Sequence, residues 1–137
     1  MTKYINYDIF IKGMVKVFEV EFFDDKDGNE PIKDFILELE EKGKTNKTDR
    51  NRADKLYRYI RVLEKSGTRA GLPYAKHIDG DIWELRPNRD RVFFFFWANN
   101  TFILVHHILK KTQKTPKREI KQAERNMVDY LKRHPRI

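Results

Sequence analysis

The spacing of hydrophobic positions in the first half of the chain predicts one strand followed by two helices. Residues 15–23 are rich in β-branched and aromatic side chains that partly alternate with charged ones, as in a strand. Asn29 is expected to cap a helix with Pro31 in its first turn. The apolar face of that helix is expected to consist of Ile32, Phe35, Ile36 and Leu39. A second helix over residues 49–66 should end at Gly67 and run antiparallel to the first.

In the second half of the chain the period changes to two, and turn-forming residues separate short apolar runs. We expect strands over residues 75–78, 82–86, 91–97 and 101–109. Four consecutive phenylalanines, residues 93–96, predict a central strand that is buried on both faces. Thr115 and Pro116 open a last helix, whose apolar side is expected to hold Ile120, Ala123, Met127 and Leu131.

This order of elements predicts the α+β class, with a mostly antiparallel sheet and helices packed against it. The length of 137 residues fits a single domain spanning 1–137, and the sequence contains no internal repeat or low-complexity tract. The absence of cysteine excludes disulfides and thiolate metal sites. No apolar run approaches the ~20 residues that span a bilayer, so we expect a cytoplasmic protein without a membrane partner.

Charge is distributed unevenly along the chain. The formal net charge is +8, but residues 19–41 contain ten acidic residues and only two lysines. From Lys42 to the end, 24 basic residues face 10 acidic ones. This asymmetry suggests a polyanionic partner for the C-terminal part, although an ordinary solvated surface would give the same count.

Arg86 and Arg91 form the first candidate site. They lie at the two ends of a short turn between expected strands, so their guanidinium groups can converge near one edge of the sheet. Planar guanidinium groups with several donors suit a phosphate. The alternative is that the two arginines only form ion pairs with Glu84, Asp81 or Asp90.

The second candidate site is the basic segment 106–118, which contains no acidic residue. Such uncompensated charge suits an RNA backbone, and it opposes the dipole at the start of the last helix. Its histidines and basic residues are His106, His107, Lys110, Lys111, Lys114, Lys117 and Arg118. Because strand side chains alternate, one histidine should face each side of the sheet, and one of them is a candidate acid or base. The pattern does not decide which one.

Other catalytic machineries have no counterpart in the sequence. It contains no glycine-rich phosphate loop, no His-Glu-x-x-His motif and no carboxylate cluster typical of two-metal nucleases. We therefore expect neither a metal nor a cofactor. Phosphodiester chemistry without a metal stays open, in which basic residues activate a ribose 2′-hydroxyl, neutralise the phosphorane and protonate the leaving oxygen.

Two motifs resemble the phage-derived branch of the RelE/HigB toxins of type II toxin–antitoxin systems. The first is Lys-Lys-Thr-Gln-Lys-Thr-Pro at 110–116, which is followed by Glu119-Ile120 and by an Ala-x-Arg motif at 123–125. The second is Trp-Glu-Leu-Arg at 83–86, with another arginine five residues later. The resemblance covers about the last half of the chain, from Leu72 to Leu131.

The resemblance implies a RelE/ParE-like fold, a small twisted antiparallel sheet with two N-terminal helices packed on it. It implies that Arg86 and Arg91 contact phosphate, and that Lys76 is a basic residue preceding the Trp-Glu-Leu-Arg strand. The terminal acid/base and backbone contacts then fall to His106 or His107 with Lys110, Lys111 and Lys114. Residues 1–14 would be an N-terminal extension, with Met14 as a second candidate start.

The function implied is metal-independent cleavage of mRNA on the ribosome, which would stop translation and growth. The implied partners are the ribosome, mRNA and a cognate HigA-like antitoxin with a helix-turn-helix domain, through which any contact with DNA would be indirect. Two alternatives on the same fold stay open: a ParE-like gyrase inhibitor, and a non-catalytic RNA-binding phage protein. The sequence gives no codon preference and no stoichiometry for the complex.

Overall fold

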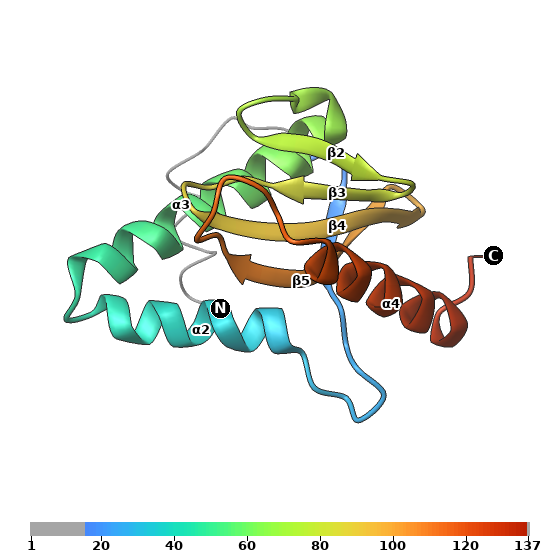
Figure 1. Ribbon diagram of the computed structural model, residues 1–137, viewed down its shortest axis with the longest axis horizontal. Coiled ribbons are helices and arrows are strands. Elements are labelled where there is room, and N and C mark those ends of the chain that lie inside the picture. Colours follow the sequence, from blue (N-terminus) through green and yellow to red (C-terminus); the bar gives the residue numbers. More distant parts are fainter. Residues whose placement is uncertain (1–15, 137) are drawn as a thin grey trace.

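The computed structural model describes residues 16–136 (Figure 1). In chain order the elements are β1 (Glu19–Phe22), α2 (Pro31–Gly43), α3 (Lys47–Ser66), a 3₁₀ turn (Gly67–Ala70), β2 (Ala75–Asp79), β3 (Ile82–Leu85), β4 (Asp90–Ala98), β5 (Thr101–Leu109) and α4 (Lys117–Arg133). The expected extension 1–14, including Met14, lies outside the described residues, as does Val15 of the expected first strand.

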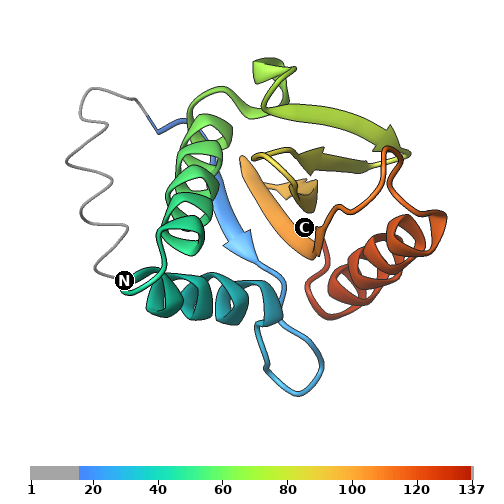
Figure 2. The same ribbon diagram turned by 60° about the vertical axis from the view of Figure 1, so that its left-hand side comes forward.

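The five strands form one sheet in the order β1-β5-β4-β3-β2. β1 pairs with β5 in parallel, and the three other pairings are antiparallel. The α2–α3 hairpin packs on one face of the sheet and α4 on the other, as Figures 1 and 2 show. These three layers confirm the expected α+β class with a mostly antiparallel sheet.

The helix hairpin follows the predicted apolar spacing, with two differences at its helix starts. α3 begins at Lys47, earlier than expected, because the side chain of Asn46 accepts a hydrogen bond from the Asp49 amide at 3.1 Å. The prediction that Asn29 caps α2 is wrong: Glu30 holds the cap position and makes no side-chain cap bond. The Asn29 amide instead donates to Asp25 Oδ1 at 2.9 Å, within the turn before the helix.

Gly67 ends α3 as predicted, and the turn there requires a glycine. Its φ of +58° lies in the left-handed region, which other residues adopt at a cost. A Cβ at this position would also lie 2.9 Å from the Phe18 ring. The helix end is therefore fitted closely against the residues that lead into β1.

β4 is the central strand, and three of its four phenylalanines confirm the prediction of burial on both faces. Phe94 is fully buried under the helix hairpin, while Phe93 and Phe95 are fully buried on the α4 face. Phe96 is an exception, with 44% of its surface exposed. It lies near the end of the strand, where its ring meets the edge of Phe102 and no helix covers it.

A β-bulge in β5 changes which way the two histidines face. Phe93 pairs with His106 whereas Phe94 pairs with Leu104, so Val105 is an extra residue in β5. Val105 and His106 consequently both lie on the α4 face, and His107 lies on the hairpin face. The two histidines face opposite sides as predicted, but the alternation expected from the sequence breaks at the bulge.

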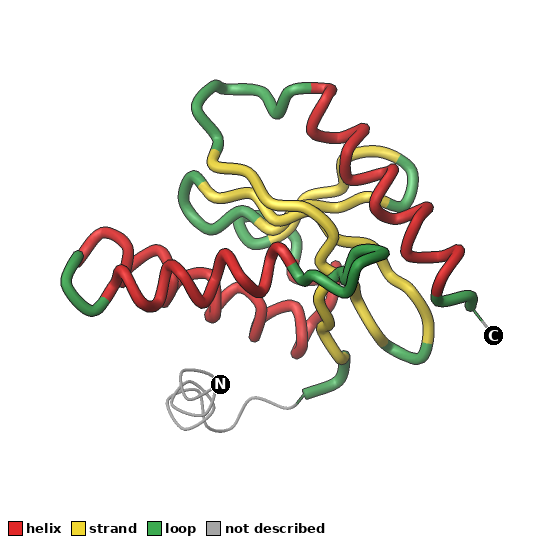
Figure 3. Tube along the Cα trace, turned by 90° about the horizontal axis from the view of Figure 1, so that it is seen from below, coloured by secondary structure: helices red, strands yellow, loops and turns green. Residues whose placement is uncertain are grey.

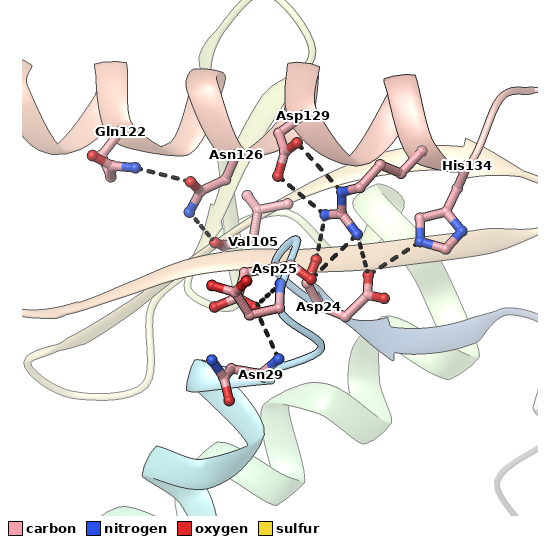
Figure 4. Close-up of polar contacts among 10 residues, drawn as sticks. Asp24, Asp25, Asn29, Val105, Gln122, Asn126, Asp129 and His134 are labelled. Atoms are coloured by element: carbon pink, nitrogen blue, oxygen red, sulfur yellow. Dashed lines mark hydrogen bonds and ion pairs between the residues drawn. The ribbon is translucent and has the colours of Figure 1, made fainter.

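α4 crosses the sheet away from the helix hairpin, as Figure 3 shows, and polar contacts hold it in place. Near its middle, the Asn126 side chain donates to the bulge carbonyl of Val105 at 2.8 Å. At its end, Arg133 pairs with Asp129 at 3.1 Å and with Asp24 at 3.4 Å (Figure 4). Asn126 contacts β5 and Arg133 contacts the loop between β1 and α2, so α4 is held both to the sheet and to that loop.

Candidate functional site

A row of side chains crosses four strands on the α4 face of the sheet. Lys76 of β2 pairs with Glu84 of β3, Glu84 pairs with Phe93 of β4, and Phe93 pairs with His106 of β5. Side chains two positions apart in a strand share a face, so Arg91 belongs to the same face as Phe93. The pairing thus brings basic and acidic groups from separate strands to one end of one face.

Glu84 is the centre of this group and is buried, with 3% of its side chain exposed. Its two carboxylate oxygens lie 3.6 Å from Arg86 Nε and 3.8 Å from Arg91 Nε. The hydroxyl of Thr115, in the connection between β5 and α4, donates to the same carboxylate at 3.4 Å. The expected convergence of the two arginines is therefore present, and one carboxylate lies between them.

Arg91 is held rigidly from the other side. Its Nη1 donates to the backbone carbonyls of Asn88 at 2.7 Å and Asp90 at 2.9 Å. Burial lowers the pKa of this guanidinium, and nearby Arg86 lowers it further while Glu84 opposes the change. The Nε atoms of both arginines are buried, and neither has a hydrogen-bond partner among the residues that the structure describes. Both Nε atoms face the carboxylate of Glu84 at ion-pair distance, and this pairing fixes the orientation of the two guanidinium groups.

A surface pocket of about 430 Å³ opens beside Arg91. It lies between the β3–β4 turn and the connection from β5 to α4, two segments joined by Lys110 N donating to Arg89 O at 2.7 Å. Its lining consists of Arg89, Arg91, Lys110, Lys111, Thr112 and Gln113. Four of these six residues are cationic and none is acidic, so the pocket suits an anion. We call it the basic pocket.

Lys110 is a lysine of the basic pocket whose surroundings lower its pKa. Partial burial lowers its pKa, and the positive charges of Arg91, Arg86 and Lys76 lower it further, while Glu84 acts in the opposite direction. Lys76 and Glu84 belong to the row of side chains that crosses the strands, and Arg86 and Arg91 are the two arginines paired with Glu84. The basic pocket and the Glu84 cluster are thus parts of one site.

His106 lies on the same face, next to this site. Its ring stacks on Phe93 with centroids 5.8 Å apart, and its Nε2 lies 3.3 Å from Glu119 in the first turn of α4. Burial lowers the pKa of His106 despite the raising effect of Glu119. His106 therefore favours the neutral form near neutral pH, which is the form a general base needs.

His107 is not brought to the site. It lies on the opposite face, where its ring stacks on Phe35 of α2 at 3.8 Å and its Nε2 lies 2.9 Å from Asp90 Oδ1. Arg52 of α3 completes the group, with Nη2 2.7 Å from the same oxygen. Burial alone would raise the pKa of Asp90, but the hydrogen bonds from His107 and Arg52 hold it lower. His107 therefore fastens the hairpin to the start of β4, immediately before Arg91.

The remaining predicted RNA contacts differ in position. Lys76 belongs to the strand row and Lys111 lines the basic pocket. Lys114, Lys117 and Arg118 are exposed along the connection and the first turn of α4, outside the pocket lining. The structure thus divides the basic segment into a pocket and a flanking charged surface.

Sequence reasoning named Glu84 only as an alternative ion-pair partner of the two arginines, and the structure shows this pairing. It missed Arg89 in the pocket and Thr115 on the carboxylate. The alternation of Ile82, Glu84 and Arg86 places Glu84 on the same face as Arg86, and this signal was available from the sequence. Arg89 gave no such signal, because its position depends on the backbone contact of the turn with Lys110.

Among residues 16–136, no group of three or more His, Cys, Asp or Glu side chains is arranged to hold a metal ion. No helix in the described part of the chain is both long and apolar enough to span a bilayer.

Fold and site together define a class of protein: a small α+β domain with a cationic pocket at one end of its sheet. Residues 32–128 match the family model described as "Phage derived protein Gp49-like (DUF891)". Because this match spans more than half of the chain, the protein belongs to the Gp49-like family. A search of curated proteins found no match.

Proposed function

We propose that this protein is the toxin of a type II toxin–antitoxin system and that it cuts mRNA on the ribosome without a metal ion. The observation that carries the proposal is the convergence of Lys76, Arg86, Arg91 and Lys110 around the buried carboxylate of Glu84. A ParE-like gyrase inhibitor would bind a protein and would have no need of convergent phosphate ligands. The resemblance to RelE/HigB toxins in residues 72–131 supports the same proposal.

In the proposed reaction, a ribose 2′-hydroxyl attacks the adjacent phosphorus and the 5′-oxygen of the next nucleotide leaves. Arg86 and Arg91 stabilise the charge that develops on the phosphorane oxygens, with guanidinium groups that are preorganised by their ion pairs with Glu84. Lys110, with its lowered pKa, is our first choice for the group that moves a proton. His106 is the second choice, because it lies on the same face. Glu84 holds both arginines in position.

The proposed partner is an antitoxin with a helix-turn-helix domain, through which the complex would contact DNA. An acidic or apolar segment of the antitoxin would suit the basic pocket and its flanking surface. Searching the DNA beside the gene for a small helix-turn-helix reading frame, and co-expressing any that is found, tests this: a true antitoxin should restore growth and co-purify with the protein.

The decisive experiment examines the ends of the cut RNA. Attack by a 2′-hydroxyl leaves a 2′,3′-cyclic phosphate and a 5′-hydroxyl, whereas metal-activated water commonly leaves a 5′-phosphate. After brief induction, primer extension should reveal new mRNA 5′ ends, and these should accept label from polynucleotide kinase without prior phosphatase treatment. The Arg86→Ala variant, expressed to the same level, is the control.

Two outcomes would contradict the proposal in different ways. If growth stops while mRNA stays intact, the nuclease assignment is wrong and gyrase inhibition should be assayed by plasmid supercoiling. If mRNA is cut but the new ends carry 5′-phosphates, cleavage occurs by another mechanism and the roles given to Lys110 and His106 fail.

A further inference from the structure

A second hollow lies on the other side of the β3–β4 turn from the basic pocket. It has a volume of about 690 Å³ and is bounded by α3, by the segment before β2 and by the turn itself. Its lining residues are Asn51, Asp54, Lys55, Arg58, Tyr59, Arg61, Val62, Pro73, Tyr74 and Asn88. We call it the tyrosine pocket, because two tyrosines form much of its apolar surface. Nothing in the proposed chemistry uses it.

The tyrosine pocket has the composition of a site for a planar ring beside a negative charge. Tyr74 is half-buried, and Tyr59 holds it edge-on with ring centroids 5.0 Å apart. Lys55 lies over the Tyr59 ring at 5.7 Å and donates to Asn88 Oδ1 at 2.7 Å. Aromatic side chains with neighbouring cations are the usual platform for an unpaired base and its backbone.

The two pockets share the β3–β4 turn. Arg91 lines the basic pocket and donates to the carbonyl of Asn88, which lines the tyrosine pocket. Figure 1 shows this turn and the β5–α4 connection at the same end of the sheet. A single strand whose phosphate occupies the basic pocket can therefore continue across the turn to the tyrosine pocket.

We infer that the tyrosine pocket binds one base of the same single-stranded RNA whose phosphate is held in the basic pocket, with Tyr74 as the stacking surface. The inference rests on the proposed function and adds a second contact point to it. The basic pocket then supplies charge, and the Tyr74 ring supplies a stacking contact that does not depend on salt.

The test uses the full-length protein and 2′-O-methyl hexa-adenylate, which cannot be cut by attack of a 2′-hydroxyl. Fluorescence anisotropy gives the Kd across a range of salt concentrations. Tyr74→Ala should weaken binding about tenfold and leave the salt dependence unchanged, because stacking on an aromatic ring is not electrostatic. Lys110→Ala should instead reduce the slope of log K against log salt by about 0.7, the value for one lost phosphate contact on a single strand.

Oligonucleotides that lack one base at each position in turn identify the stacked base without altering the protein. In the wild type, one position should show about a tenfold loss, and that loss should disappear in Tyr74→Ala. Tyr74→Phe, which keeps the ring, should bind like the wild type. Phe96→Ala is the matched control, because it removes an exposed aromatic ring far along β4 and should leave the Kd unchanged.

The results separate this inference from the proposed function, because cleavage of ribosome-bound mRNA is measured on the same preparations. The inference is overturned if Tyr74→Ala binds like the wild type, if no abasic position matters, or if the wild type binds no oligonucleotide. Wild-type RNA binding by Tyr74→Ala would also be the result if the pocket served a protein partner. The proposed function fails on a different result, intact mRNA with the wild-type protein.

Discussion

The two faces of the sheet differ in the side chains that cover them. The face under the helix hairpin is closed by fully buried apolar side chains such as Leu56, Ile60 and Phe94. On the α4 face, an apolar patch around Phe95 and Tyr130 gives way towards one end to Glu84 and its arginines. The α4 face therefore combines an apolar patch with a buried charged cluster.

This difference shows where the molecule can carry chemistry. A charged cluster needs burial to fix its geometry, yet burial of charge costs free energy unless other contacts offset it. The apolar core under the hairpin supplies that stability, and the α4 face contains the Glu84 cluster. The Arg52–Asp90–His107 contact joins the two, since Asp90 immediately precedes Arg91. We can therefore separate the faces by mutation.

The largest effect should follow from removing core volume on the hairpin face. Phe94→Ala should lower the free energy of unfolding by about 3–5 kcal/mol, because it leaves a cavity at a fully buried site. Urea unfolding measures this. Phe96→Ala, two residues along the same strand and 44% exposed, should cost about 1 kcal/mol or less. Equal losses would show that this face is not the main source of stability.

Removing an arginine of the α4 face should affect cleavage more than stability. Arg86→Ala should reduce the rate about 10²–10³-fold, the usual cost of one lost donor to a developing oxyanion. Glu84 keeps Arg91 and Thr115 as partners and the Arg86 side chain is 25% exposed, so the variant should stay folded and lose less stability than Arg91→Ala. Cleavage of ribosome-bound mRNA and urea unfolding are measured on one preparation. A folded variant that cuts at the wild-type rate would contradict the role assigned to Arg86.

Arg91→Ala should lose activity to a similar degree but should also lose stability. Arg91 donates to two turn carbonyls and is buried, so its removal leaves the acceptors of Asn88 and Asp90 unpaired. We expect a loss of about 1–3 kcal/mol in the free energy of unfolding. If Arg86→Ala and Arg91→Ala unfold at the same urea concentration, the turn does not depend on Arg91.

The contact of Asp90 with Arg52 and His107 should have an intermediate effect on the free energy of unfolding. Asp90→Asn should lower the free energy of unfolding at neutral pH by about 1.5–3 kcal/mol, because Arg52 and His107 lose a buried carboxylate. The pKa of Asp90 is held below its ordinary value near 3.8, so this stabilisation is complete above that pH and is lost as the pH falls towards the folded-state pKa. The difference in free energy of unfolding between the variant and the wild type should therefore decrease in acid. A difference that stays constant with pH would exclude the Asp90 carboxylate as its source.

The smallest effect on stability should come from replacing His106. Burial lowers its pKa below the ordinary value of 6.5, so the unfolded chain binds the proton more readily than the folded one. Stability should therefore decrease as the pH falls below about 6.5. His106→Gln should remove this part of the pH dependence, which thermal unfolding between pH 5 and pH 8 measures in buffers of equal ionic strength. Identical profiles for the two proteins would show that His106 is not the responsible group.

Local patterns predicted most of the fold because the sheet and helices obey simple periodicities. The run Phe93–Phe96 identified the central strand, and the turn between Arg86 and Arg91 correctly predicted that the two arginines converge. The exposure of Phe96 was not predictable, because it depends on where the covering helices end.

The site was less predictable because its key contacts join distant parts of the chain. Glu84 accepts a hydrogen bond from Thr115, which lies 31 residues further along the chain. The tyrosine pocket combines Tyr59 of α3 with Tyr74, which lies before β2, and no local motif connects these two residues. The cap at Asn29 failed for a local reason, since the Asn29 amide bonds to Asp25 in the turn before the helix and Glu30 takes the cap position.

The bulge at Val105 has a consequence for sequence alignment and for evolution by insertion and deletion. Phe94 pairs with Leu104 and Phe93 pairs with His106, so β5 contains one residue more than its partner requires. A deletion of Val105 would remove the bulge and leave His106 opposite Phe93 and His107 opposite Val92, so both histidines would keep their faces of the sheet. Related chains are therefore best aligned across positions 104–106 with a single-residue gap permitted.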